Sequence, residues 1–180
     1  HRSIRRQRQM CIRDRFSSGP FWNRQHHNAL TDISFNIGVN KTSFTGIVGE
    51  SGSGKTTLAL LILGFLSPTK GKVTYHGKDI NQFSKNDRKE FIRKVQPIYQ
   101  DPFASFNPFY KIDRVLTYPL LKFNPSLPKS KYSDEIHLAL DSVGLNPRET
   151  LGRFPHQLSG GQRQRLMLAR CLLCKPEIII

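Results

Sequence analysis

Residues 49–56 read Gly49-Glu-Ser-Gly-Ser-Gly-Lys-Thr56 and match the phosphate-loop pattern G-x-x-x-x-G-K-[ST]. An apolar run of strand length, residues 43–48, precedes this loop, and a helix-forming run, residues 55–65, follows it. The motif requires this order of strand, loop and helix. A glycine-rich turn that merely precedes a helix would match as well, but the context favours a phosphate site. The sequence therefore predicts an α/β fold that binds a nucleoside triphosphate.

The residue types of the loop suit phosphate chemistry. Glycines allow successive backbone N–H groups to turn inward around phosphate oxygens, and the start of the following helix adds positive potential. Lys55 supplies a cation for the β- and γ-phosphates, and Thr56 offers a hydroxyl to Mg²⁺. We predict that ATP and Mg²⁺ are bound by Gly49, Glu50, Ser51, Gly52, Ser53, Gly54, Lys55, Thr56 and Thr57.

Hydrophobic patterning on both sides of the loop predicts further strands and helices. Residues 16–27 are polar and turn-rich, which indicates a loop or hairpin, and a turn is expected at His76–Gly77. Between residues 101 and 155 the chain changes to helical patterns, which we interpret as an inserted helical segment. The expected strands are residues 30–37, 43–48, 72–75, 95–99 and one starting at 178; the expected helices are residues 55–65, 85–94, 112–122, 132–143 and 160–174.

A second motif, Leu158-Ser-Gly-Gly-Gln162, lies about a hundred residues after the phosphate loop. Ser159 followed three residues later by Gln162 forms a capping box, so the motif predicts at least a well-capped helix start. A serine beside the N–H groups of a helix N-terminus also makes an anion site. The local pattern leaves both interpretations open.

With both motifs in one chain, the sequence resembles the ATP-binding subunit of ABC transporters, whose signature is LSGGQ. The resemblance implies a P-loop NTPase fold with a RecA-like core, an antiparallel β-subdomain and an α-helical subdomain. It also implies a head-to-tail dimer with a second ATP-binding subunit. In that dimer the phosphate loop of one subunit and the signature of the other enclose ATP, here through Ser159, Gly160, Gly161 and Gln162.

Residues 100–108, Gln-Asp-Pro-Phe-Ala-Ser-Phe-Asn-Pro, resemble the sequence that begins with the Q-loop glutamine in dipeptide, oligopeptide and nickel importers. The resemblance implies that Gln100 contacts Mg²⁺ and the attacking water and acts with Lys55 in catalysis. Phe106 replaces the usual Leu, and Phe109 stands where an Arg often follows, so the subfamily is less sharply defined than the superfamily. The resemblance also implies an aromatic residue before residues 30–37 that stacks on adenine; Phe16 is the expected one, with Phe21 and Trp22 as competitors and a plain core or loop aromatic as the alternative.

Residues 5–15, RRQRQMCIRDR, resemble the translation of a transposase sequencing adapter, so we interpret residues 1–15 as adapter-derived. A basic arm for nucleic acid is the alternative interpretation of the same stretch. The formal charge of the chain is +15, and setting aside the six Arg and one Asp of residues 1–15 lowers it by 5 to +10. The true N-terminus is then expected to be missing.

The resemblance divides the remaining chain into three parts. Residues 16–100 form the first part of the ATP-binding core with the phosphate loop and Q-loop, residues 101–155 the helical subdomain, and residues 156–180 the signature helix and the start of the Walker B strand. The Mg²⁺-binding Asp and water-activating Glu of the family would follow Ile180. We therefore expect a fold truncated at its C-terminus, and a fragment that is poorly soluble and does not hydrolyse ATP alone.

The function implied by the resemblance is ATP-driven uptake of di- or oligopeptides or nickel. The partners would be transmembrane permease subunits and a solute-binding protein, with the chain bound peripherally at the cytoplasmic face of the inner membrane and no nucleic acid. A soluble ABC-type ATPase acting on nucleic acid or ribosomes is the alternative, suggested by the remaining +10; a regulator without turnover is a third interpretation. Cys171 and Cys174 lack further metal-ligand partners at zinc-site spacing, which favours two buried thiols over a metal site.

Overall fold

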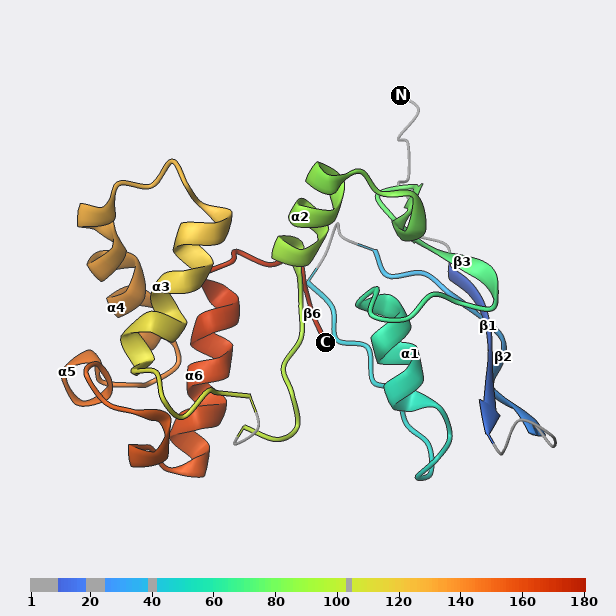
Figure 1. The fold of residues 1–180 in the computed structure, drawn as a ribbon, viewed down its shortest axis with the longest axis horizontal. Helices are drawn as coiled ribbons and strands as arrows, with labels where there is room; N and C mark the ends of the chain where they lie inside the picture. The colour runs from blue at the N-terminus through green and yellow to red at the C-terminus, as the bar shows by residue number, and fades with distance from the viewer. Residues whose placement is uncertain (1–9, 19–24, 39–41, 103–104) are drawn as a thin grey trace. The chain divides into compact units, whose positions relative to one another are not determined.

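A computed structural model describes residues 10–18, 25–38, 42–102 and 105–180 of the chain. The chain divides into two compact units, residues 1–88 and residues 89–180 (Figure 1). The first unit contains an antiparallel sheet and the helix that follows the phosphate loop, and the second is mainly helical. Both parts agree with the predicted antiparallel β-subdomain and α-helical subdomain.

The sheet of the first unit has four antiparallel strands in the order β2-β1-β3-β4. Ser18 pairs with Gln25, so of the two alternatives predicted for residues 16–27, a loop or a hairpin, the structure has the hairpin. Residues 10–15, which we interpret from the sequence as adapter-derived, lie in β1: main-chain pairing with β2 runs along them, and residues 10–13 also pair with β3. The strands are β1 (Met10–Ser18), β2 (Gln25–Phe35), β3 (Lys70–Tyr75) and β4 (Lys78–Asp79).

The turn between β3 and β4 lies at the predicted place. His76 and Gly77 both have positive φ, 51° and 79°, which is the backbone geometry of a tight hairpin turn that matches the twist of its strands. The side chains of Val73 and Tyr75 are buried next to this turn. The hairpin therefore contributes to the apolar interior of the first unit.

Helix α1 (Lys55–Ile62) begins directly after the phosphate loop. It ends three residues earlier than the predicted Phe65, because Gly64 adopts a left-handed conformation with φ 69°. The N–H of Phe65 then donates to the carbonyl of Leu60 at 2.9 Å, and the N–H of Gly64 donates to the carbonyl of Leu61 at 3.1 Å. This pair of hydrogen bonds is a Schellman motif, which terminates the helix.

The strand predicted at residues 43–48 is absent from the structure. These residues form no regular element, and the side chains of Phe44 and Val48 are 101% and 93% exposed. A strand depends on a neighbour that pairs with its backbone, and none of the described strands pairs with this segment. The apolar pattern is typical of a strand, but the pattern cannot form a strand alone.

The second unit combines a short parallel pair of strands with helices. The two strands pair at residues 95–96 and 178–179. The N–H of Ile98 also donates to the carbonyl of Ile180, so the hydrogen bonding between the two segments extends past the end of both strands. The predicted strand at residues 95–99 and the one starting at 178 are thus present but short. The elements are β5 (Val95–Gln96), β6 (Ile178–Ile179), α3 (Ile112–Phe123), α4 (Tyr132–Ser142), α5 (Pro147–Thr150) and α6 (Gly160–Leu172), with 3-10 turns η2 (Lys129–Lys131) and η3 (Pro155–Gln157).

Helices α3, α4 and α6 pack around one apolar core. The buried positions of α3 recur at helical spacing, so a single face of this helix points inward. Leu158, just before α6, belongs to the same core and thereby anchors the start of the signature helix. The buried members are Phe106, Ile112, Leu116, Leu120, Ile136, Ala139, Leu140, Leu145, Leu158, Leu166, Met167, Ala169 and Leu173.

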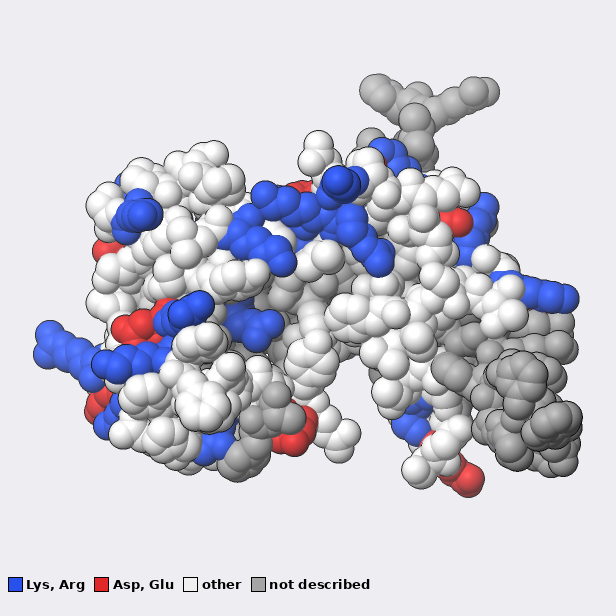
Figure 2. Space-filling view, in the orientation of Figure 1, with Lys and Arg blue, Asp and Glu red and all other residues white. Residues whose placement is uncertain are grey.

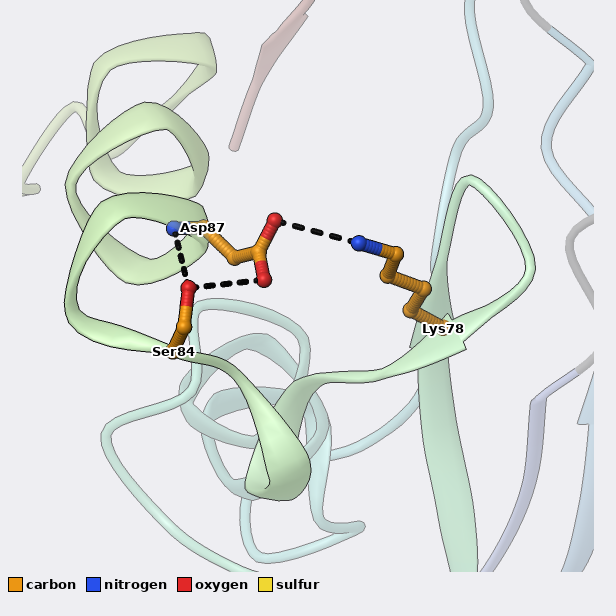
Figure 3. A network of polar contacts seen from close by, with 3 residues as sticks. All are labelled: Lys78, Ser84 and Asp87. Carbon is orange, nitrogen blue, oxygen red and sulfur yellow. Dashed lines mark hydrogen bonds and ion pairs between the residues drawn. The ribbon is translucent and has the colours of Figure 1, made fainter.

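Helix α2 (Lys85–Lys94) is joined to the β3–β4 hairpin by a polar network (Figure 3). The hydroxyl of Ser84 accepts from the N–H of Asp87 at 3.1 Å and donates to its carboxylate at 2.9 Å. Lys78 of β4 pairs with the other carboxylate oxygen at 3.3 Å. These contacts, and η1 (Ile80–Gln82) between them, hold the hairpin and the start of α2 together.

Candidate functional site

The phosphate loop lies in the first unit and ends at the start of α1. Gly52 and Gly54 have φ values of 83° and 87°, a left-handed conformation that favours glycine. Gly54 is the N-cap of α1 and supplies no side-chain hydrogen bond to the first turn. The first N–H groups of α1 therefore lack the side-chain acceptor that caps many helices, and they are suited to an anionic oxygen.

Lys55 is held against its own loop. Its ammonium donates to the carbonyl of Gly49 at 2.7 Å, to the carbonyl of Glu50, and to the hydroxyl of Ser53 at 3.2 Å. A methyl group on Gly49 would approach the Ser53 hydroxyl oxygen to 2.7 Å, closer than real Cβ contacts allow. Glycine at position 49 thus leaves room for the Ser53 hydroxyl where Lys55 contacts it, and the lysine side chain lies back over the loop.

The remaining residues of the predicted phosphate site are placed next to this lysine in sequence and in space. Thr56 is exposed and Thr57 is half-buried in the first turn of α1, while Ser51 and Gly52 lie at the exposed tip of the loop. One cation, exposed hydroxyls and uncapped helix amides form a donor set that fits a polyphosphate with a bound Mg²⁺. The structure places these residues in the loop and the first turn of α1, and their role in nucleotide binding stays a prediction.

The signature motif lies in the second unit at the start of α6. The hydroxyl of Ser159 accepts from the N–H of Gln162 at 3.2 Å, and the amide oxygen of Gln162 accepts from the N–H of Ser159 at 2.8 Å. The predicted capping box is therefore confirmed. Ser159 and Gly161 are exposed and Gly160 is half-buried, so the motif faces outward while Leu158 anchors it.

Gln100 and Phe16 are the two predicted site residues outside these motifs. Gln100 is exposed in the second unit, in the segment that follows β5. Phe16 lies in β1, where its Cα pairs with that of His27. Their roles at Mg²⁺, water and adenine stay predictions.

Sequence reasoning missed the contacts that hold the segment before the signature motif. The carboxylate of Asp113 accepts a hydrogen bond from the N–H of Gly152 at 2.7 Å, and the carbonyl of Arg153 accepts from the N–H of Ile112 at 2.9 Å. These partners are about forty residues apart, so no local pattern links them. The glycine at position 152 was the available signal in the sequence, because glycine favours turns. In the structure its φ is 77°, and it lies at a turn before the signature motif.

The two cysteines of the second unit are buried, as the sequence predicted. Burial raises the pKa of the Cys171 thiol, and it raises the pKa of Cys174 to about 11. Among the described residues, no three His, Cys, Asp or Glu side chains are grouped to hold a metal ion. Within the residues that the structure describes, no helix has both the length and the apolarity to cross a membrane.

Basic side chains are numerous on the face shown in Figure 2, most densely over α2. Two basic residues of α2 are paired with acids, Arg93 with Glu90 at 2.6 Å and Lys94 with Glu177 at 3.6 Å. Pairs of this kind at a surface offset part of the positive charge. The positive charge is therefore partly neutralised within the fold.

A glycine-rich loop with a lysine at one helix start and a capped LSGGQ motif at another define a nucleotide-binding cassette. The profile of the family described as "ABC transporter" matches residues 30–180, most of the chain. The chain belongs to the ABC transporter family.

Curated relatives agree with this assignment. The di/tripeptide transport ATP-binding protein DppF of Pseudomonas aeruginosa is 38% identical over 164 residues, covering 91% of this chain and 50% of that protein. The oligopeptide transport ATP-binding protein OppF of Haemophilus influenzae is 38% identical over 152 residues, covering 84% of this chain and 45% of that protein. The chain thus spans about half the length of these relatives.

A solved structure shares the fold. The dimeric post-hydrolysis structure of the ATP-binding cassette MJ0796, bound to ADP and Pi, matches with a TM-score of 0.79 at 25% identity. The match covers 96% of this chain and 72% of that one. The α/β P-loop NTPase fold predicted from the sequence is confirmed. These relatives give no support to the nucleic-acid alternative.

Proposed function

We propose that the chain is the ATP-binding part of an ABC importer, in which hydrolysis of Mg²⁺-bound ATP drives uptake of di- or oligopeptides. The observation that supports it most is the arrangement at Lys55, where an ammonium, two left-handed glycines and an uncapped helix start converge. The similarity to DppF and OppF, named as peptide transport proteins, supports the substrate class. Nickel stays a second candidate through the resemblance of residues 100–108 to nickel importers.

The phosphate loop performs the binding step. The N–H groups at the start of α1 donate to phosphate oxygens. Lys55 exchanges some of its hydrogen bonds to the loop carbonyls for hydrogen bonds to the β- and γ-phosphates. The hydroxyl of Thr56 and the amide oxygen of Gln100 would hold Mg²⁺, which neutralises phosphate charge when bound. Gln100 would also orient water, and Phe16 would stack on the adenine.

The signature motif performs its step in a partner's site. Because the hydroxyl oxygen of Ser159 accepts from Gln162, its hydrogen is available to donate to an anionic oxygen. Gly160 and Gly161 add N–H groups at the positive end of α6. We propose that these groups face the γ-phosphate bound by a second ATP-binding subunit, so that two subunits in head-to-tail contact enclose each ATP.

The proposed assembly includes transmembrane permease subunits and a solute-binding protein, with this chain at the cytoplasmic face of the inner membrane. The dimeric state of the MJ0796 cassette supports pairing with a second ATP-binding subunit. The names of DppF and OppF, transport ATP-binding proteins, support association with transport partners. Gln100, beside the segment that begins the helical subdomain, would link nucleotide state to the permease.

Nucleotide binding is tested with a fluorescent ATP analogue, MANT-ATP, and Mg²⁺. Lys55→Ala removes the loop cation and should weaken binding at least about tenfold, the scale of one charge-assisted contact. Lys85→Ala, a change of an exposed lysine on α2, is the matched control and should bind as the wild type does. Equal binding by all three proteins would contradict the proposed site.

Transport is tested with the complete gene product and its proposed permease subunits, reconstituted in proteoliposomes. ATP supplied on the side of the ATP-binding subunits should drive uptake of a labelled dipeptide, and Lys55→Ala should abolish it. Uptake of nickel but not of peptide would transfer the assignment to the nickel class. ATP turnover stimulated by RNA, without transport of either solute, would overturn the proposal.

A further inference from the structure

A two-bond clamp joins the start of α3 to the segment that leads into the signature motif. The carboxylate Oδ2 of Asp113 accepts from the N–H of Gly152 at 2.7 Å. The residue before Asp113 and the residue after Gly152 are also bonded: the N–H of Ile112 donates to the carbonyl of Arg153 at 2.9 Å. The two bonds pair neighbouring residues of α3 with neighbouring residues of the lead-in segment, residues 152–158.

The clamp satisfies groups that would otherwise lack partners. Ile112 is the first residue of α3, so its N–H has no acceptor within the helix, and the N-cap residue Lys111 supplies no side-chain cap. The carbonyl of Arg153 takes that place from a distant part of the chain. Asp113 sits in the first helical turn, where a carboxylate is favoured by the helix dipole. Lys111 adds a contact with its ammonium 5.9 Å from the ring centre of Phe154.

From the clamp to the signature, the backbone is held almost continuously. The N–H of Phe154 donates to the side-chain oxygen of Gln157 at 2.8 Å, and the N–H of Leu158 donates to the carbonyl of Pro155 at 3.1 Å. The side chain of Leu158 is 3% exposed, and Ser159 follows it directly in the capping box. The lead-in segment therefore has its fixed ends at the clamp and at Leu158.

We propose that Asp113 is a positioning residue for the signature motif: its bond to Gly152 holds the lead-in segment so that Ser159 and the first amides of α6 present a fixed geometry. This inference rests on the proposed function, since it concerns the group that would face the γ-phosphate. Donors to a transferring phosphoryl group must be held within a few tenths of an ångström, and an irregular segment needs such a tether to do so. Asp113 itself does not contact nucleotide.

The test uses the complete gene product with three substitutions. Asp113→Ala removes the acceptor for Gly152, Asp113→Asn keeps an oxygen in nearly the same place, and Asp141→Ala removes an exposed carboxylate from α4 of the same unit as the matched control. Amide hydrogen exchange is measured by mass spectrometry over residues 152–162. Turnover gives kcat and KM for ATP, and MANT-ATP gives the affinity of the phosphate loop.

For Asp113→Ala, exchange over residues 152–162 should accelerate roughly tenfold and kcat should fall roughly tenfold, the scale of one charge-assisted hydrogen bond. MANT-ATP affinity should stay within about twofold, because the phosphate loop is untouched. Asp113→Asn should recover most of both effects, and Asp141→Ala should show neither.

Several outcomes would overturn the inference. Unchanged exchange and kcat in Asp113→Ala would do so, as would an Asp113→Asn variant no better than Asp113→Ala, since the retained oxygen must rescue. If Asp113→Ala does not fold, Asp113→Asn decides the matter, because exchange and kcat near wild-type values are required of it. A wild-type protein that binds no MANT-ATP would instead refute the proposed function, and the two failures are distinguished in this way.

Discussion

A side chain at position 49 would require the Ser53 hydroxyl to move, because an added Cβ would approach that oxygen to 2.7 Å. We predict that Gly49→Ala weakens MANT-ATP binding about tenfold or more, because the new methyl group would force away the hydroxyl that Lys55 contacts. Fluorescence titration measures the change. Gly38→Ala is the control, since its methyl group would meet no atom within 4 Å and its φ is not positive. Equal losses in both variants would contradict the steric explanation.

At the scale of residues, the sequence predicted those contacts that lie close along the chain. Residues 159–162 form the predicted capping box, and residues 49–57 form the predicted loop and helix start, although the strand predicted before that loop is absent. The bond from Gly152 to Asp113 could not be predicted, because it joins residues 39 positions apart and depends on how α3 packs. Local chemistry can be inferred from neighbouring residues, whereas contacts between distant segments require the fold.

The capping box of α6 gives a prediction at the scale of one helix. Ser159→Ala removes the oxygen that accepts from the N–H of Gln162, and we expect a loss of about 1 kcal/mol in unfolding free energy. Ser159→Asp should retain most of the stability, since Asp is a good N-cap. Urea unfolding followed by circular dichroism measures both variants. Ser130→Ala, an exposed serine of η2, should leave the midpoint unchanged.

The link between the hairpin and α2 predicts a pH effect. The hydroxyl of Ser84 and then the ammonium of Lys78 lower the pKa of Asp87 below its usual 3.8. A lowered folded-state pKa stabilises the fold above the usual value, and the stabilisation disappears as the pH falls through the folded pKa. Wild type and Asp87→Asn should therefore differ in urea midpoint above pH 3.8 and converge as the pH falls through the lowered folded-state pKa.

The titration of Asp87 can also be followed directly by NMR. Ser84→Ala and Lys78→Ala should each raise the pKa of Asp87, since the hydroxyl and the ammonium both lower it. No change in either variant would show that the network of Figure 3 does not set this pKa.

Elements were predictable where their stabilising partners are local. The helices at residues 85–94 and 112–122 were predicted within a residue of their ends, since their charged ends and apolar faces lie in the pattern itself. Helix α1 was predicted too long, because the left-handed turn at Gly64 closes it early. The run at residues 43–48 shows the limit, as a strand needs a pairing neighbour that no local pattern specifies.

The two buried thiols report on the integrity of the whole second unit. In a Cys11→Ser background, Cys171 and Cys174 should resist a thiol reagent at pH 8 until the unit unfolds, because both are buried and their raised pKa keeps them protonated. The labelling rate over a urea series, compared with circular dichroism, measures this. Immediate labelling in native buffer would contradict the burial of α6.

The same thiols make the unit sensitive to alkaline pH. Their folded-state pKa lies above the ordinary 9.0, and that of Cys174 is about 11, so their protonated form favours the folded state. This contribution is present below pH 9.0 and is lost as the pH rises towards about 11. Replacing both by Ala should remove that alkaline dependence, which urea midpoints measured across this pH range would reveal.

Strand β1 occupies the interior of its sheet, between β2 and β3, although part of it resembles a translated sequencing adapter. Main-chain hydrogen bonds do not distinguish one side chain from another, so many sequences can occupy a strand position of this kind. Trimming the first fifteen residues would leave two neighbouring strands with open edges, which invite aggregation. Anyone preparing this protein should therefore replace that stretch with another strand-forming sequence rather than simply delete it.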